Sequence, residues 1–253
     1  MNNKPPLTPP KEGDSSPPLG ELEGACKYII MKKIVVITGA GMSAESGIST
    51  FRDSDGLWEN HRIEDVATPE GWRKNPQLVL DFYNERRRQL EHCQPNAGHI
   101  GLAEMEKDFD VHIITQNVDN LHERAGSSKV LHLHGELTKA CDEHKTIVKD
   151  IGYRDIKLGE KLGNTQMRPF IVWFGEAVPA IKEAINIVQS SDIMVVIGSS
   201  LQVYPAAGLV NYASKGAPIY LIDPKEVPTQ RNVHFIQKGA SAGVAELRKI
   251  LSI

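Results

Sequence analysis

Short apolar segments of the kind that form buried strands recur along this 253-residue chain, separated by stretches compatible with helices. Candidate strands lie at 34–37, 111–115, 130–135, 193–197 and 219–223, and helices are expected from 69, over 77–90, 97–105, 181–189 and 206–214. Strands that are apolar at nearly every position are typical of a parallel sheet covered on both faces. The sequence therefore predicts an α/β fold: a Rossmann-like parallel sheet with helices on both faces, plus a small inserted module.

Two further stretches lie between the candidate strand at 130–135 and the candidate helix at 181–189. Residues 136–168 are polar and predict irregular structure, and 170–176 predicts a further extended element. Thr68 and Pro69 together mark a helix start, with threonine as the cap and proline at the first helical position.

The first apolar strand breaks into a turn of glycine and small polar residues. Gly39 to Ala44 fits the G-x-G-x-x-A dinucleotide pattern. Small residues let backbone N–H groups approach a phosphate, which a side chain would block. The same pattern also arises wherever a strand turns tightly into a helix. Phe51 and Arg52 follow in a polar loop that could close over a ligand, and the Arg52 guanidinium could bind phosphate. The alternative interpretation is that Phe51 anchors the loop and Arg52 is exposed to solvent.

Composition excludes several classes of protein. The net charge is −3, which is unlike the basic field of a nucleic-acid binder, and we expect no specific nucleic-acid partner. No apolar run reaches the length of a membrane span, and no secretory segment precedes the first strand. The three cysteines, Cys26, Cys93 and Cys141, are scattered, which fits a reducing compartment. We therefore expect a cytoplasmic protein, and a monomer.

Polar residues follow several of the predicted strands. Gln116, Asn117 and Asp119 come after one strand, His134 after the next, and 198–200 after a third. Because ligands bind at the carboxyl ends of parallel strands, these residues should converge on one crevice. There the amide and carboxylate groups could bind ribose hydroxyls or a carboxamide, and His134 could act as a base. Singly, each residue is more often a turn former, a cap or a core histidine; together they favour a site.

Five motifs in this order resemble those of the sirtuins, which are NAD-dependent protein deacylases. The motifs span 39–52, 116–122, 132–135, 172–176 and 198–205, and the resemblance covers about 32–251. Residues 67–69 and 82–87 are most similar to the class III members of the bacterial CobB type.

The resemblance implies removal of acyl groups (acetyl, succinyl, with malonyl a further candidate) from protein lysines, giving nicotinamide and O-acyl-ADP-ribose. His134 would act as general base on ribose hydroxyls after the acyl oxygen attacks the anomeric carbon. Residues implied for NAD are Gly39, Ala40, Gly41, Ser43, Phe51, Arg52, Trp58, Gln116, Asn117, Asp119, Gly198, Ser199, Ser200, Asp223 and Ser241. Residues implied for the acyl-lysine substrate are Val172, Trp173, Phe174, Gly175 and Val203, with Ala67, Tyr83 and Arg86 at the acyl end.

The chain departs from the sirtuin pattern in its inserted module. The family usually holds zinc there with four cysteines, but 136–168 contains only Cys141, and the whole chain has three cysteines. We therefore expect no bound metal, and a module held by apolar packing instead. The residues expected to pack are Ile147, Val148, Tyr153, Ile156 and Leu158.

The expected organisation has two parts. Residues 1–30, rich in proline pairs, predict a disordered tail or a misassigned start ahead of Met31. Residues 31–253 predict the catalytic domain, with its core at about 31–50, 96–135 and 170–253, a helical insertion at about 51–95 and the zinc-module equivalent at about 136–169. Two alternative functions stay open: a protein ADP-ribosyltransferase, and a non-catalytic module that binds NAD or ADP-ribose.

Overall fold

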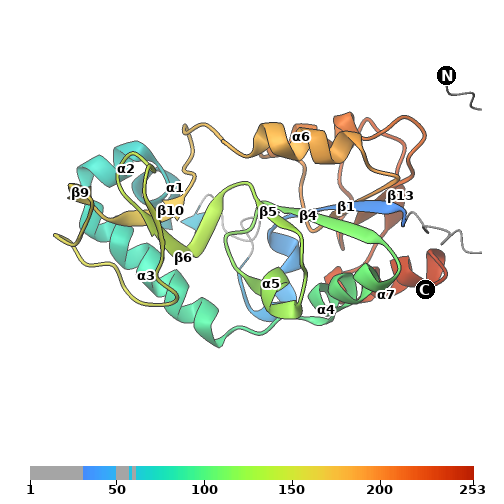
Figure 1. Ribbon diagram of the computed structural model, residues 1–253, viewed down its shortest axis with the longest axis horizontal. Coiled ribbons are helices and arrows are strands. Elements are labelled where there is room, and N and C mark those ends of the chain that lie inside the picture. Colours follow the sequence, from blue (N-terminus) through green and yellow to red (C-terminus); the bar gives the residue numbers. More distant parts are fainter. Residues whose placement is uncertain (1–30, 50–56, 59–60) are drawn as a thin grey trace, which may run out of the picture. The chain divides into compact units, whose positions relative to one another are not determined.

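A six-stranded parallel sheet forms the centre of the fold (Figure 1). The computed structural model describes residues 31–49, 57–58 and 61–253. The strand order is β13-β12-β11-β1-β4-β5, and every neighbouring pair is parallel. The bounds are β1 (Lys33–Thr38), β4 (Asp110–Thr115), β5 (Val130–His132), β11 (Ile193–Ile197), β12 (Ile219–Ile222) and β13 (His234–Ile236). The predicted fold class is confirmed; the short edge strand β13 was not expected.

Helices cover both faces of this sheet (Figure 1). Helices α4 (Ala97–Glu104) and α7 (Ala240–Ile250) pack on one face, and α6 (Ile181–Gln189) packs on the other with the 3-10 helix η4 (Ala206–Tyr212). Alternate residues of β1 enter the two apolar clusters: Ile34 and Val36 face α7, whereas Val35 and Ile37 face α6. This is why the strand is apolar at nearly every position. Among the described helices, none has the length and apolar character needed to cross a membrane.

A smaller antiparallel sheet with its own helices forms a second cluster of buried residues. Its strands run in the order β10-β6-β7: β6 (Gly135–Cys141), β7 (Val148–Asp150) and β10 (Arg168–Ile171). Helices α1 (Ile63–Val66), α2 (Pro69–Lys74) and α3 (Pro76–His92) accompany it, with the small hairpins β2–β3 (Leu57–Trp58, His61–Arg62) and β8–β9 (Lys161–Leu162, Thr165–Gln166). Thr68 caps α2 by accepting from Gly71 N at 3.0 Å, as predicted.

Three predictions about local structure differ from the structure. Residues 136–168 are not irregular, because most of β6 and all of β7, β8 and β9 lie within them. The seven-residue strand β6 is mostly buried but carries polar residues among its apolar ones, and the three residues of β7 are exposed, so neither strand leaves a continuous apolar run. The extended element predicted over 170–176 ends at Ile171, and the chain then turns, with Glu176 N donating to Trp173 O at 3.0 Å. The predicted helix at 206–214 is a 3-10 helix that ends at Tyr212.

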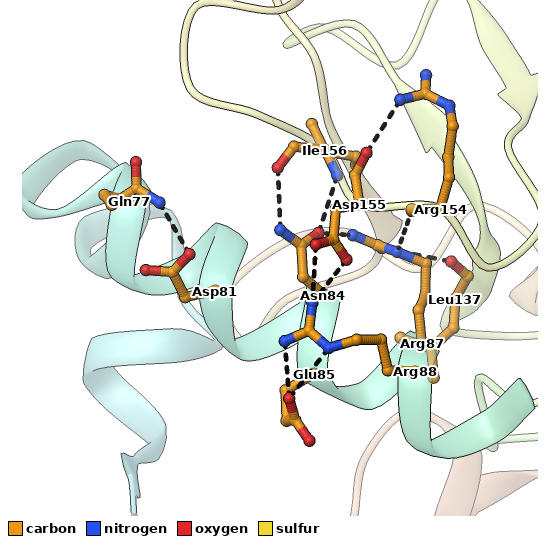
Figure 2. Close-up of polar contacts among 10 residues, drawn as sticks. All are labelled: Gln77, Asp81, Asn84, Glu85, Arg87, Arg88, Leu137, Arg154, Asp155 and Ile156. Atoms are coloured by element: carbon orange, nitrogen blue, oxygen red, sulfur yellow. Dashed lines mark hydrogen bonds and ion pairs between the residues drawn. The ribbon is translucent and has the colours of Figure 1, made fainter. Parts of the chain in front are cut away.

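Helix α3 holds the inserted module through hydrogen bonds (Figure 2). Asn84 donates to Ile156 O at 3.0 Å and accepts from Ile156 N at 2.9 Å. Arg87, which is fully buried, donates to Arg154 O at 3.1 Å and to Leu137 O at 3.4 Å. Of the five apolar residues expected to pack the module, Ile156 is buried and Tyr153 packs against the core, but Ile147, Val148 and Leu158 are exposed. The module therefore depends on polar contacts that composition does not reveal.

Candidate active site

The loops that follow β1 and β11 are packed against each other at three glycines. Gly39 N donates to Ile197 O at 3.0 Å, and Gly41 N donates to Gly198 O at 2.9 Å. A Cβ on Gly198 would lie 2.4 Å from two backbone atoms, Gly41 C and Met42 N, and Gly198 has φ +61°. The glycines are therefore required for the close contact between the two loops. Two 3-10 turns follow Gly39 in place of a regular α-helix.

Three polar side chains form a buried group between these loops and the loop after β4. Asn117 Nδ2 donates to Gly39 O at 3.0 Å and to Ser43 Oγ at 3.1 Å. Ser43 Oγ in turn donates to Asp119 at 2.9 Å. Burial raises the pKa of Asp119, although hydrogen bonds from Leu121 N and Ser43 oppose that rise. The group holds an amide and a carboxylate in fixed positions beside the glycine turn.

His134 lies next to this group, and a hydrogen bond made by its ring fixes the orientation of the side chain. Its Nδ1 is 3.0 Å from Gln116 O, a carbonyl that can only accept, so Nδ1 carries the proton in the neutral ring. Within the described ranges, no protein group is hydrogen-bonded to Nε2. Burial lowers the pKa of His134, so the ring is neutral at neutral pH and Nε2 can accept a proton. Gln116 also donates to Ser199 Oγ at 3.0 Å, which links this loop to the loop after β11.

The segment that follows β10 lies on the other side of His134. Val172 N donates to His134 O at 2.8 Å, and Phe174 N donates to Ala67 O at 3.0 Å. Trp173 is buried, and its indole N–H donates to Tyr83 Oη at 3.1 Å. Burial raises the pKa of Tyr83, so the phenol remains protonated.

One cavity of about 500 Å³ joins these parts. Its lining includes the predicted residues Gly39, Ala40, Gly41, Ser43, Ala67, Tyr83, Arg86, Gln116, Asn117, Asp119, His134, Val172, Trp173, Phe174, Gly175, Gly198, Ser199, Ser200, Val203 and Asp223. Ser241 is not among the lining residues, and its N–H donates to Glu45 at 3.2 Å. Phe51, Arg52 and the side chain of Trp58 lie outside the described residues. The predicted convergence at the carboxyl ends of the strands is thus observed.

Comparison with known proteins identifies the family. The sequence profile of the Sir2 family matches residues 39–205. The chain belongs to the Sir2 family. An NAD-dependent protein deacylase from Bacteroides thetaiotaomicron is 58% identical over 230 residues, which cover 87% of this chain and 98% of the relative. The sirtuin resemblance is confirmed.

Solved structures of Sir2 proteins show the same fold. A Sir2 homologue solved with NAD superposes with a TM-score of 0.78 at 37% identity, covering 87% of this chain and 91% of the other. A mutant Sir2 solved with a deacetylated p53 peptide and 3′-O-acetyl-ADP-ribose superposes with a TM-score of 0.74 at 28% identity, covering 88% and 95%.

Sequence reasoning left one carboxylate of the Sir2 chain without a role. Glu176 accepts from Trp173 N at 2.8 Å, from Lys145 Nζ at 2.7 Å and from Arg168 Nη1 at 3.1 Å. The Arg168 guanidinium also lies 3.5 Å from the centre of the Trp173 ring. Burial opposes ionisation of Glu176, but these donors outweigh it and lower its pKa. Glu176 therefore ties the segment after β10 to the inserted module; its place in the 172–176 motif was the available signal.

A second group of residues, behind the glycine turn, was also missed. Asn96 donates to Met42 O at 2.8 Å and to Ser46 Oγ at 3.1 Å while capping α4. His99 accepts from Asn96 N at 3.3 Å, and its ring centre lies 4.8 Å from that of His122. In the part of the chain that the structure describes, His99 Nε2 is buried without a hydrogen-bond partner. The helix-start signal could have found the cap, but not its contact with the turn.

Proposed function

We propose that this chain is an NAD-dependent protein-lysine deacylase. The observation that carries the proposal is His134, whose Nε2 is open in a cavity lined by the glycine turn and the Asn117–Asp119 loop, with residues 172–175 opposite. The names of the curated relatives and the Sir2 structures with NAD and with an acetyl-ADP-ribose product support the same chemistry. The catalytic domain in this proposal is residues 31–253.

The residues present fit NAD. Gly39, Ala40 and Gly41 line the cavity with small residues, which leaves room beside the turn for a pyrophosphate. Asn117 and Asp119 suit the nicotinamide ribose, and Asp223, at the end of β12, suits the adenosine ribose. Bound NAD supplies the ribose carbon that the acyl oxygen attacks as nicotinamide leaves. His134 then takes a proton from a ribose hydroxyl at Nε2, a positioned-base step typically worth ~10²–10⁴-fold in rate.

The substrate side fits an extended peptide. Residues 172–175 continue from the end of β10 along the cavity, and Phe174 and Tyr204 present exposed rings nearby. We infer that the acyl-lysine backbone pairs with this segment as an added strand, so that it is bound with little sequence preference.

We further infer that the acyl end of the cavity accepts a carboxylate. Tyr83 and Arg86 both line it from α3, three residues apart and on one face of the helix. A phenol and a guanidinium can bind a terminal carboxylate by charge-assisted hydrogen bonds, and Ala67 leaves room for it. Succinyl-lysine should therefore be a substrate alongside acetyl-lysine.

We also infer that the inserted module does not depend on zinc. Burial raises the pKa of Cys141 to about 11, so this thiol stays protonated and is a poor metal ligand. Among the described residues, no group of three or more histidine, cysteine, aspartate or glutamate side chains is placed to hold a metal. Asp142 instead closes the turn after β6, accepting from Ile147 N at 2.7 Å and Thr146 Oγ1 at 2.8 Å.

Nicotinamide release tests the catalytic proposal. The full chain is incubated with NAD labelled in its ADP-ribose part and with acetyl-, succinyl- and long-chain acyl-lysine peptides. The expected result is peptide-dependent nicotinamide release, with the label in O-acyl-ADP-ribose. Label on protein would instead indicate an ADP-ribosyltransferase, and no release would indicate a binding module; either result would overturn the proposal.

Elemental analysis tests the zinc inference separately. The purified chain should contain no stoichiometric zinc, and its melting temperature and activity should be unchanged in excess chelator. One zinc per chain, lost together with the fold on chelation, would show that residues 136–168 form a metal site after all.

A further inference from the structure

A second histidine lies two residues before His134 and contacts the cofactor loop. His132, the last residue of β5, has a side chain that is only 8% exposed. Its Nδ1 is 3.1 Å from Asn117 O, and its Nε2 is 2.7 Å from the Glu123 carboxylate on α5 (Leu121–Ala125). The ring therefore bridges the loop that carries Asn117 and the helix that follows it.

The two partners of this ring determine its protonation. A backbone carbonyl and a carboxylate can only accept hydrogen bonds, whereas a neutral imidazole has one N–H to donate. A neutral His132 would leave a nitrogen lone pair facing an oxygen at one of these two contacts. An imidazolium donates at both nitrogens and satisfies both partners.

We propose that His132 is a positioning residue, held as an imidazolium that ties the Asn117 carbonyl to Glu123 and so fixes the loop 116–120 for NAD. The proposal rests on the proposed function, because the loop matters only if Asn117 and Asp119 bind the cofactor. His132 does not line the cavity and acts through Asn117.

The charges around the ring support the cationic form. Glu123 faces it from α5, and Glu136 faces it from β6, where it is paired with Lys139 at 2.5 Å. His122 on α5 is buried, and burial lowers its pKa, so it adds no positive charge. Asp119 in the cofactor loop interacts favourably with His132. Burial alone lowers the pKa of His132, but the hydrogen bond and charge of Glu123 outweigh burial and raise it.

Loss of the charge on His132 predicts a pH dependence of cofactor affinity. As the pH rises through the raised pKa of His132, the ring loses one N–H, and the link between Asn117 O and Glu123 that fixes loop 116–120 is broken. The affinity for the cofactor should therefore fall as the pH rises. The pKa of His134 is lowered, so His134 loses its function as a base only when the pH falls. The two histidines can thus be separated by pH.

Ring protonation in the unliganded wild-type chain is the first test. Nitrogen-15 NMR at pH 7 should show a bonded proton on both ring nitrogens of His132. A ring with a single N–H at pH 7 would overturn the proposal. This measurement needs no variant and no activity.

Calorimetric titration with ADP-ribose between pH 6 and pH 9 is the second test. H132Q, which cannot be charged, should bind about tenfold more weakly at pH 7. E123Q should bind nearly as tightly as wild type at pH 6, with the alkaline loss of affinity moved to lower pH. H112Q is the matched control, because His112 lies in β4 and pairs with Asp110 at 3.0 Å, away from the cavity; it should behave as wild type.

The outcomes separate this proposal from the deacylase proposal. If wild type binds ADP-ribose and both H132Q and E123Q keep its affinity and pH profile, the positioning role is overturned while the cofactor site survives. If wild type does not bind ADP-ribose at any pH, the proposed function and the positioning role are both overturned.

Discussion

Gly198 offers a test of how tightly the glycine turn at residues 39–44 packs against the loop after β11. An alanine there would place its Cβ 2.4 Å from both Gly41 C and Met42 N, atoms of the turn itself. Both are backbone atoms, so no flexible side chain can move aside. Ordinary van der Waals contact begins at 3.4 Å, and the turn would therefore have to shift by about 1 Å. Gly198 also has φ +61°, a conformation that alanine adopts only with strain.

The cost can be estimated in two parts. A left-handed conformation costs an L-residue about 1–2 kcal/mol, and overpacking of a tight contact costs about 1–3 kcal/mol. For a chain of this size each kcal/mol lowers the melting temperature by about 2–4 °C, so G198A should lose roughly 4–20 °C. The turn lines the cavity where we propose that NAD binds, so a displacement of about 1 Å there should also lower kcat/KM by roughly 10²-fold.

Gly216 supplies the matched control. It has φ +85°, but a Cβ there would meet nothing within 4 Å. G216A should therefore show the conformational cost alone, a loss of about 2–8 °C, with unchanged ADP-ribose affinity and kcat/KM. Thermal unfolding, calorimetry with ADP-ribose and peptide deacylation would be measured on both variants. The reasoning is refuted if G198A binds ADP-ribose and turns over substrate as well as G216A does.

Three further predictions concern the catalytic base, the acyl end and the histidines behind the turn. H134A should keep its melting temperature and most ADP-ribose affinity but lose deacylation by ~10²–10⁴-fold; wild-type turnover would contradict the mechanism. R86M should raise KM for a succinyl-peptide far more than for an acetyl-peptide, and an equal loss on both would exclude a carboxylate site. Burial lowers the pKa of His99 from 6.5 to about 4, so between pH 7 and pH 4 the unfolded chain takes up the proton before the folded chain does. Urea unfolding should therefore show the free energy of unfolding falling by about 3 kcal/mol over this range. H99Q should show a smaller fall.

The sequence by itself determined the fold class and the edge where the site forms. Residues of β1 face apolar clusters on both sides, and burial on two faces leaves a continuous apolar run that can be recognised without a structure. Because parallel strands end at one edge, the positions of Asn117 and His134 after their strands were enough to predict that they meet. Thr68 and Pro69 predicted a helix start because capping depends on residues three apart.

Only the tertiary structure decided which distant groups touch. The contact of Gly41 with Gly198 requires β11 to lie beside β1, and that strand order is set by packing of the whole sheet. The same holds in the inserted module, where Asn84 holds Ile156 from 72 residues away while Ile147, predicted to pack there, is exposed. Apolar periodicity records which side of an element is buried, but a hydrogen bond across the fold leaves no periodic signal in the sequence.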